Sequence, residues 1–214
     1  MAATAAMRTL GDLMRRLGGV PLGRVRFRPA PGTATVRDVI DLAEREDVLC
    51  ELVEGVLVEK TTGLRESRLA TFLGSLILPF VLARNLGIVT GADGTMEIMP
   101  NLVRIPDLAF TSWDRMPGRR QPTEPVPELV PNLAVEVLSA GNTPGEMLTK
   151  RQDYFRAGVE LGWEVDPVAR TVAVYAAPVG PAILGAGDVL GGGAVLPGFA
   201  LPLAQLFGEL DRQG

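Results

Sequence analysis

Two carboxylates and one lysine are the residues of this chain whose types and spacing suggest chemistry. Asp107 precedes the apolar run Leu-Ala-Phe, and Glu136 lies in the middle of Leu-Ala-Val-Glu-Val-Leu. Short apolar runs bounded by Pro, Gly and Asn predict buried strands. A carboxylate in a buried strand is costly unless a positive group meets it. If the two strands are neighbours, both acids can face one side and hold a hard divalent cation.

Such a site would suit metal-assisted phosphoryl chemistry. The cation would lower the pKa of a bound water and stabilise a charged phosphoryl transition state. Lys150, on the helix expected after the Glu136 run, could donate to the phosphate or orient the water. Glu51, in Cys-Glu-Leu-Val-Glu-Gly, is a third acid that a nearby strand could bring in.

The same residues also fit a structural ion pair. Glutamate is almost never fully buried unless it is paired, and Arg104 or Arg151 could be the partner of Glu136. Asp107 beside a proline fits a turn cap, and Lys150 fits a solvated helix position. The residue types alone leave a metal site and an ion pair both open.

A hairpin, two further strands and a helix must position these side chains. Residues 48–53 and 56–60 flank Glu54-Gly55 and predict a β-hairpin that carries Glu51. The runs at Asp107 and Glu136 predict two further strands. Thr143-Pro-Gly-Glu146 is a helix start, with a capping threonine and a proline at the first helical position, so Lys150 lies on a helix.

Composition indicates one soluble α/β domain. The chain has 214 residues, of which 47% are hydrophobic and 21% charged, and helical and strand patterns alternate as in a sheet covered on both faces. Residues 1–34 form an arginine-rich extension with a helix at about 7–18, and residues 35–214 form the globular domain. The uncharged run at 69–83 is short for a membrane span and predicts a buried helix.

Residue types that are absent or rare in the chain limit the catalytic mechanisms and metal sites it can have. The chain has no histidine and one cysteine, Cys50, which excludes Ser-His and Cys-His mechanisms, the usual zinc sites and an intramolecular disulfide. Oxygen ligands favour magnesium or manganese. The only lysines are Lys60 and Lys150, so a role that needs an amine has two candidates. The single cysteine and the absence of a signal peptide predict a cytoplasmic protein.

Charge is distributed unevenly along the chain. The net charge is −4, which gives no general attraction to nucleic acid. Residues 1–37 nevertheless carry seven arginines and one acid, so a local basic patch is open to this segment. A solvated helix face and a nucleic-acid-binding arm both fit these arginines.

Several motifs, in order, resemble the Uma-two family of restriction-endonuclease-like proteins in the PD-(D/E)XK nuclease superfamily. The resemblance covers roughly residues 35–176. The matching pieces are Glu51-Leu-Val-Glu-Gly-Val-Leu-Val58, Ile105-Pro-Asp-Leu-Ala109, Leu133-Ala-Val-Glu-Val-Leu-Ser139, Lys150 with Tyr154, Ala157-Gly158-Val159 and Trp163-Glu-Val-Asp-Pro167.

The resemblance implies a restriction-endonuclease-like fold, with a central mixed sheet flanked by helices. It implies hydrolysis of DNA phosphodiester bonds with Mg²⁺, for which Mn²⁺ can substitute. Asp107 and Glu136 match the metal-binding acids, Lys150 matches the superfamily's lysine, and Glu51 matches a recurrent glutamate of the first hairpin. In the superfamily the lysine usually stands two residues after the second acid, where this chain has Leu138.

Two function classes follow. The first is a magnesium-dependent endonuclease acting on DNA, which the complete Asp, Glu and Lys set favours. The alternative is a catalytically inactive nuclease fold that binds nucleic acid or a protein partner, which the acidic net charge and the missing histidine favour. The sequence leaves a homodimer open, through residues 69–83 or the glycine-rich C-terminal part.

Overall fold

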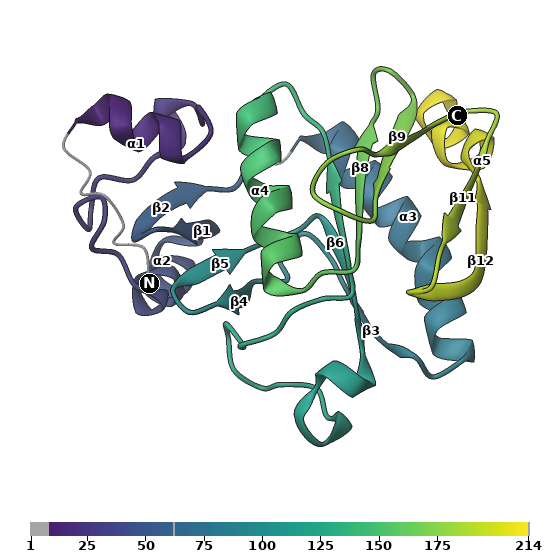
Figure 1. The fold of residues 1–214 in the computed structure, drawn as a ribbon, viewed down its shortest axis with the longest axis horizontal. Coiled ribbons are helices and arrows are strands. Elements are labelled where there is room, and N and C mark those ends of the chain that lie inside the picture. Colours follow the sequence, from purple (N-terminus) through teal and green to yellow (C-terminus); the bar gives the residue numbers. More distant parts are fainter. Residues whose placement is uncertain (1–8, 62, 214) are drawn as a thin grey trace.

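A six-stranded mixed sheet forms the centre of the computed structural model, which describes residues 9–61 and 63–213 (Figure 1). Its strand order is β10-β9-β8-β7-β6-β3. The strands β7 and β8 run parallel, and the other neighbours are antiparallel. The bounds are β3 Gly87–Thr90, β6 Leu108–Ser112, β7 Leu133–Val137, β8 Leu161–Asp166, β9 Thr171–Tyr175 and β10 Ala182–Gly185.

Side chains alternate between the two faces of this sheet, as strand geometry requires. On β6 and β7, Leu108, Phe110 and Val135 belong to the main hydrophobic core. Ala109 and Ala134, between them, belong to a second core on the opposite face. Both faces are therefore buried, which explains why these strands are almost continuously apolar.

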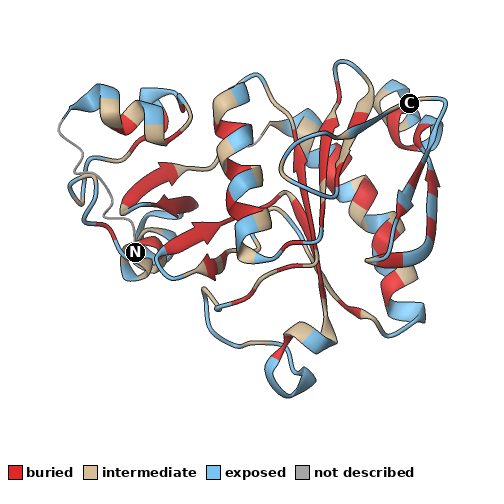
Figure 2. Cartoon of the chain, in the orientation of Figure 1, coloured by how far each residue is buried: buried red, intermediate tan, exposed pale blue. Residues whose placement is uncertain are grey.

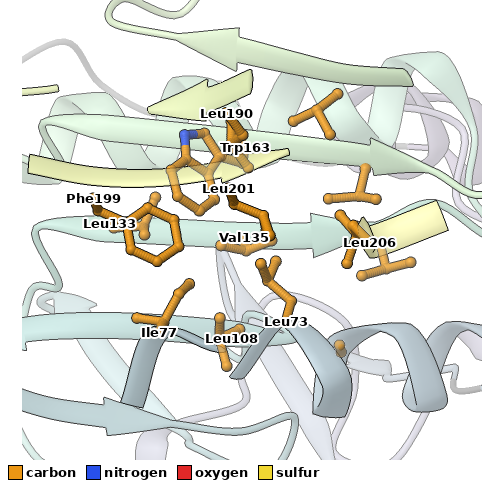
Figure 3. Close-up of a cluster of buried hydrophobic side chains, with 14 of the residues drawn as sticks. Leu73, Ile77, Leu108, Leu133, Val135, Trp163, Leu190, Phe199, Leu201 and Leu206 are labelled. Atoms are coloured by element: carbon orange, nitrogen blue, oxygen red, sulfur yellow. The ribbon is translucent and has the colours of Figure 1, made fainter. Parts of the chain in front are cut away.

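The helix α3, Leu64–Ala83, covers the main core. Figure 3 shows Leu73 and Ile77 of this helix against Leu108 and Val135 of the sheet. By length and composition α3 is apolar enough to cross a membrane, although only 28% of the relevant window is buried inside the protein. Its buried stripe nevertheless packs on the sheet, as expected for the core helix predicted from residues 69–83.

Leu73→Ala should lower the free energy of unfolding by about 2–5 kcal/mol, because it leaves a cavity under α3. Leu73 is 1% exposed, whereas Leu82 on the same helix is 65% exposed. Urea denaturation of Leu73→Ala and of the matched Leu82→Ala variant measures the difference. A loss in Leu82→Ala as large as that in Leu73→Ala would contradict this packing.

The C-terminal part completes the main core together with α3 and the central sheet. It consists of the hairpin β11, Val189–Gly192, with β12, Leu196–Pro202, followed by α5, Leu203–Gly208. The Phe199 ring stacks on Trp163 with centroids 6.2 Å apart. Four 3-10 turns complete the described structure: Leu22–Arg24, Trp113–Arg115, Pro117–Arg119 and Glu209–Asp211.

A separate four-stranded sheet lies beside the central one, in the order β2-β1-β5-β4. Its strands are β1 Cys50–Val53, β2 Val56–Glu59, β4 Met96–Met99 and β5 Leu102–Arg104, and the helix α2, Val36–Glu46, precedes it. The predicted hairpin is confirmed: Glu54 and Gly55 turn between β1 and β2 with φ of 49° and 74°. Figure 1 shows the helix α4, Pro144–Ala157, between the two sheets.

The N-terminal segment packs against α4. Its helix α1, Leu10–Arg16, is capped by Thr9; the predicted helix began at residue 7, and residues 1–8 lie outside the described chain. Arg24 is buried and contacts Glu146 in the first turn of α4 at 2.9 Å. Gly18 lies so close to Gly145 that a Cβ on it would be 2.3 Å from that backbone. Figure 2 shows the mixture of buried and exposed residues along this segment.

Candidate active site

Asp107 and Glu136 lie side by side where the chain crosses from one sheet to the other. The crossing is the segment between β5 and β6, and Asp107 is its last residue. The Asp107 amide donates to the Val135 carbonyl at 2.9 Å, and its Oδ2 accepts from the Val137 amide at 2.7 Å. Since these two residues flank Glu136 on β7, the backbone holds the two acids in register.

Two residues one turn apart on α4 meet Glu136. The Lys150 Nζ lies 3.2 Å and 3.1 Å from Oε1 and Oε2 of Glu136. The Tyr154 hydroxyl donates to Oε1 at 2.7 Å. Thr143 caps the helix and forms a capping box with Glu146, so the predicted helix start is confirmed. Residues four apart lie on one helix face, which lets both side chains reach the same acid.

Glu51 reaches the same cluster from β1 of the second sheet. Its Oε1 lies 3.0 Å from Lys150 Nζ and accepts from the Ile105 amide at 3.2 Å. Its Oε2 accepts from Arg104 at 2.7 Å. Arg104 also contacts the buried carboxylate of Asp153 on α4. One buried ionic network therefore joins the two sheets through α4.

The second lysine of the chain meets the other acid. The Lys60 Nζ lies 2.9 Å from Asp107 Oδ1 and donates to the Ile105 carbonyl at 2.6 Å. Its side chain is only 4% exposed. From the sequence, Lys60 was only one of two available amines. The small number of lysines was the one indication in the sequence that Lys60 belongs to the site, since both lysines of the chain lie in this cluster.

The sequence-based partners for the acids need correction. Glu136 pairs with Lys150 and Tyr154, neither of which was the expected arginine. Arg104 pairs with Glu51 and Asp153 instead. Arg151 pairs with Glu164 on the neighbouring strand β8 at 2.5 Å. Tyr154 is buried, and its hydroxyl is part of the cluster.

Burial and charge shift the pKa values in this cluster in different directions. Burial raises the pKa of Glu136, with the negative charge of Asp107 adding to it and Lys150 opposing it. Burial disfavours the charged ammonium of Lys150, but Glu136 and Glu51 outweigh this effect and raise its pKa. Burial and the charge of Glu136 raise the pKa of Tyr154. Lys150 is therefore a permanent cation and Tyr154 a neutral donor at neutral pH.

The pKa of Glu51 is lowered from 4.5 to about 2. Burial alone would raise it, but Lys150 and Arg104 outweigh burial. A depressed folded-state pKa stabilises the fold at pH above the unfolded value, and this stabilisation is lost as the pH falls through the folded value. The contribution of Glu51 is therefore present above about pH 4.5 and disappears toward pH 2.

Glu51→Gln should flatten the dependence of the free energy of unfolding on pH between about 4.5 and 2. Urea denaturation at several pH values measures this dependence. Glu54→Gln is the matched control, because Glu54 is an exposed glutamate in the turn of the same hairpin. If Glu51→Gln kept the wild-type slope, its carboxylate would not be held ionised by the network.

Solvent reaches the two acids unequally. Asp107 lines an open hollow of about 350 Å³, whose wall includes Ser67, Thr71 and Ser75 of α3. Glu136 and Lys150 line a narrow cavity of about 10 Å³. A ligand can therefore reach this cluster from the Asp107 side.

The donor chemistry fits one hard divalent cation held by two carboxylates. Among the residues that the structure describes, no three His, Cys, Asp or Glu side chains gather closely enough to form a metal site on their own. Glu51 is accordingly a partner of Lys150 and Arg104, and does not extend an acid cluster. Mg²⁺ needs only one or two carboxylates, because it keeps several waters and takes substrate phosphate oxygens as ligands.

Comparisons with known proteins support a nuclease fold. A family model described as "Uma2: Putative restriction endonuclease" matches residues 36–204. A crystal structure described as a putative nuclease belonging to DUF820, from Anabaena variabilis, superposes with a TM-score of 0.67 at 18% identity, covering 76% of this chain and 91% of that one. A search of curated proteins gives no match. The observed mixed α/β architecture thus agrees with the predicted restriction-endonuclease-like fold.

Proposed function

The chain belongs to the Uma2 family of putative restriction endonucleases, and on this premise we propose that it is a Mg²⁺-dependent endonuclease that hydrolyses DNA phosphodiester bonds. The observation that carries this proposal is the pair Asp107 and Glu136. Asp107, just before β6, is held beside Glu136 by hydrogen bonds with Val135 and Val137 of β7, and it opens on a hollow.

Asp107 and Glu136 would hold the cation, with Mn²⁺ as a substitute for Mg²⁺. When bound, such an ion lowers the pKa of a water ligand and offsets charge on the reacting phosphate. Asp107 Oδ2 accepts from the Val137 amide, and Oδ1, which contacts Lys60 at 2.9 Å, would be the oxygen offered to the ion. Glu136 has both oxygens contacted by Lys150, so its orientation is fixed before any ion arrives.

Lys150 and Glu51 position the metal-binding acid Glu136. The ammonium of Lys150 lies between the carboxylates of Glu51 and Glu136, at 3.0 Å and 3.1 Å. Its positive charge lowers the pKa of Glu136 against the effect of burial and so favours the ionised form, which is the form that binds a cation. Glu51 in turn anchors Lys150 to the second sheet. A fixed geometry of this kind is what metal-assisted catalysis requires of residues around the ligands.

A second function rests on a different observation. Both acids already have a lysine partner, at 2.9 Å for Asp107 and 3.1 Å for Glu136. Ion pairs of this kind also suit a catalytically inactive nuclease fold that binds nucleic acid or a protein partner. The inactive module would bind no divalent ion through these acids and would not cleave DNA.

The partner in the proposed activity is DNA, acted on in the cytoplasm. Cleavage of both strands of a duplex would need two sites, because one site handles one phosphodiester at a time. We therefore extend the proposal to a homodimer for double-strand cleavage.

The test of the activity is its dependence on the ion. Purified protein is incubated with supercoiled plasmid and with short duplex and single-stranded DNA, in Mg²⁺, Mn²⁺ or EDTA. Cleavage in Mg²⁺ or Mn²⁺ that EDTA abolishes supports the endonuclease. DNA binding without cleavage in any of these conditions favours the inactive module.

A further inference from the structure

The two lysines of the cluster differ in how much hydrogen-bonding capacity they have left. An ammonium group has three N–H donors. Lys150 has three carboxylate oxygens around it, one from Glu51 and two from Glu136, at 3.0–3.2 Å. Its capacity is filled by residues of the chain itself, which leaves no donor for a substrate.

Lys60 has one N–H donor that no contact in the described chain uses. Its contacts within the described chain are Asp107 Oδ1 and the Ile105 carbonyl, which use two of its three donors. Its position is fixed, because its amide donates to the Leu49 carbonyl at 2.9 Å as the hairpin β1–β2 ends. A rigid backbone position keeps the ammonium beside Asp107.

The two lysines also differ in what lies next to them. The acid that Lys60 contacts lines the open hollow of about 350 Å³. The acid that Lys150 contacts lines the narrow cavity of about 10 Å³. A phosphate arriving through the open hollow therefore meets Asp107, the acid that Lys60 contacts, before it meets Glu136 and Lys150.

We propose that Lys60 is the residue whose ammonium contacts the reacting phosphate, and that Lys150 is a buried positioning residue for the acids. This inference rests on the proposed nuclease function and deepens it. The α3 side chains that line the hollow include Ser67 and Thr71, which carry hydroxyl groups, whereas the Ser75 hydroxyl already donates to the Phe72 carbonyl at 2.7 Å. Hydroxyls of this kind can donate to other phosphates of the same strand.

The same geometry makes Lys60 a competitor of the divalent ion. Both are cations, and both would use Oδ1 of Asp107, since Oδ2 accepts from the Val137 amide. Removing the charge of Lys60 should therefore tighten binding of Mn²⁺ while it weakens binding of DNA. A residue with a purely structural role would not shift the two affinities in opposite directions.

The experiment compares wild-type protein with Lys60→Met and Lys60→Arg. Binding of a labelled 30-base-pair DNA duplex is measured at several salt concentrations in Ca²⁺, and Mn²⁺ binding is measured by calorimetry. Loss of one phosphate contact reduces the slope of log K against log salt by about 0.9. We expect this reduction, weaker DNA binding and tighter Mn²⁺ binding in Lys60→Met, and a wild-type slope in Lys60→Arg.

The outcomes of this experiment test the role of Lys60 separately from the proposed nuclease function. A wild-type salt slope in a folded Lys60→Met protein that still binds Mn²⁺ overturns the role of Lys60 and leaves the nuclease intact. If Lys60→Met does not fold, Lys60→Gln takes its place under the same criteria. A wild-type protein that binds neither Mn²⁺ nor DNA overturns the proposed function, and the role of Lys60 falls with it.

Discussion

Arg104→Met should lower the free energy of unfolding by about 3–5 kcal/mol, because removing one member of a buried ion pair leaves the other charge uncompensated. Arg104 contacts two acids at once, Glu51 on β1 and Asp153 on α4, and all three residues are buried. Methionine fills a similar volume but supplies no charge. Urea denaturation at pH 7 measures the loss.

The matched control is Arg119→Met. Arg119 also contacts an aspartate, Asp114 at 2.7 Å, but both side chains are mostly exposed. Exposed ion pairs contribute about 0–1 kcal/mol, so this variant should unfold almost like the wild type. Equal and small losses in the two variants would show that the ion pairs of Arg104 do not hold the two sheets and α4 together.

The second large effect is on activity. Glu136→Gln should reduce DNA cleavage by at least about 100-fold, because even residues that only contact a metal ligand typically account for 10–100-fold. Glutamine keeps the shape and can still meet Tyr154, but it removes the charge that a cation needs. Initial rates on the DNA substrate that the wild-type protein cleaves measure the change.

Glu164→Gln is the control for this variant. Glu164 stands directly opposite Glu136 in the pairing of β7 with β8 and is also buried against a cation, Arg151. Glu164 resembles Glu136 in residue type, in burial and in its pairing with a cation. Within the described part of the chain, however, it contacts neither Lys150 nor Asp107. Cleavage lost equally in both variants would mean that buried charge in general, and not the Asp107–Glu136 pair, supports activity.

Local signals in the sequence were enough to predict the elements that carry the site. The turn at Glu54-Gly55 and the capping box at Thr143 and Glu146 are decided by residues within a few positions of each other. The apolar runs around Asp107 and Glu136 specified two buried strands, and the structure pairs them. The sequence left open whether these strands are neighbours, although sequential strands commonly pair.

The partners of the site residues could not be predicted in the same way. Glu51 meets Arg104 across 53 positions of sequence, and Lys60 meets Asp107 across 47, through contacts that join two sheets. Periodicity indicates that a residue is buried but does not identify its partner. The division into a six-stranded and a four-stranded sheet was also missed, because it depends on where the chain crosses over after β5.

The most direct test of the metal site is a calorimetric titration of the purified protein with Mn²⁺. We expect the wild type to bind Mn²⁺, Glu136→Gln and Asp107→Asn to lose this binding, and Glu164→Gln to keep it. Circular dichroism checks that every variant is folded. Binding that persists unchanged in either acid variant would contradict a site built on Asp107 and Glu136. Absence of binding in the wild type at millimolar Mn²⁺, with and without a DNA duplex, would favour the inactive nuclease fold.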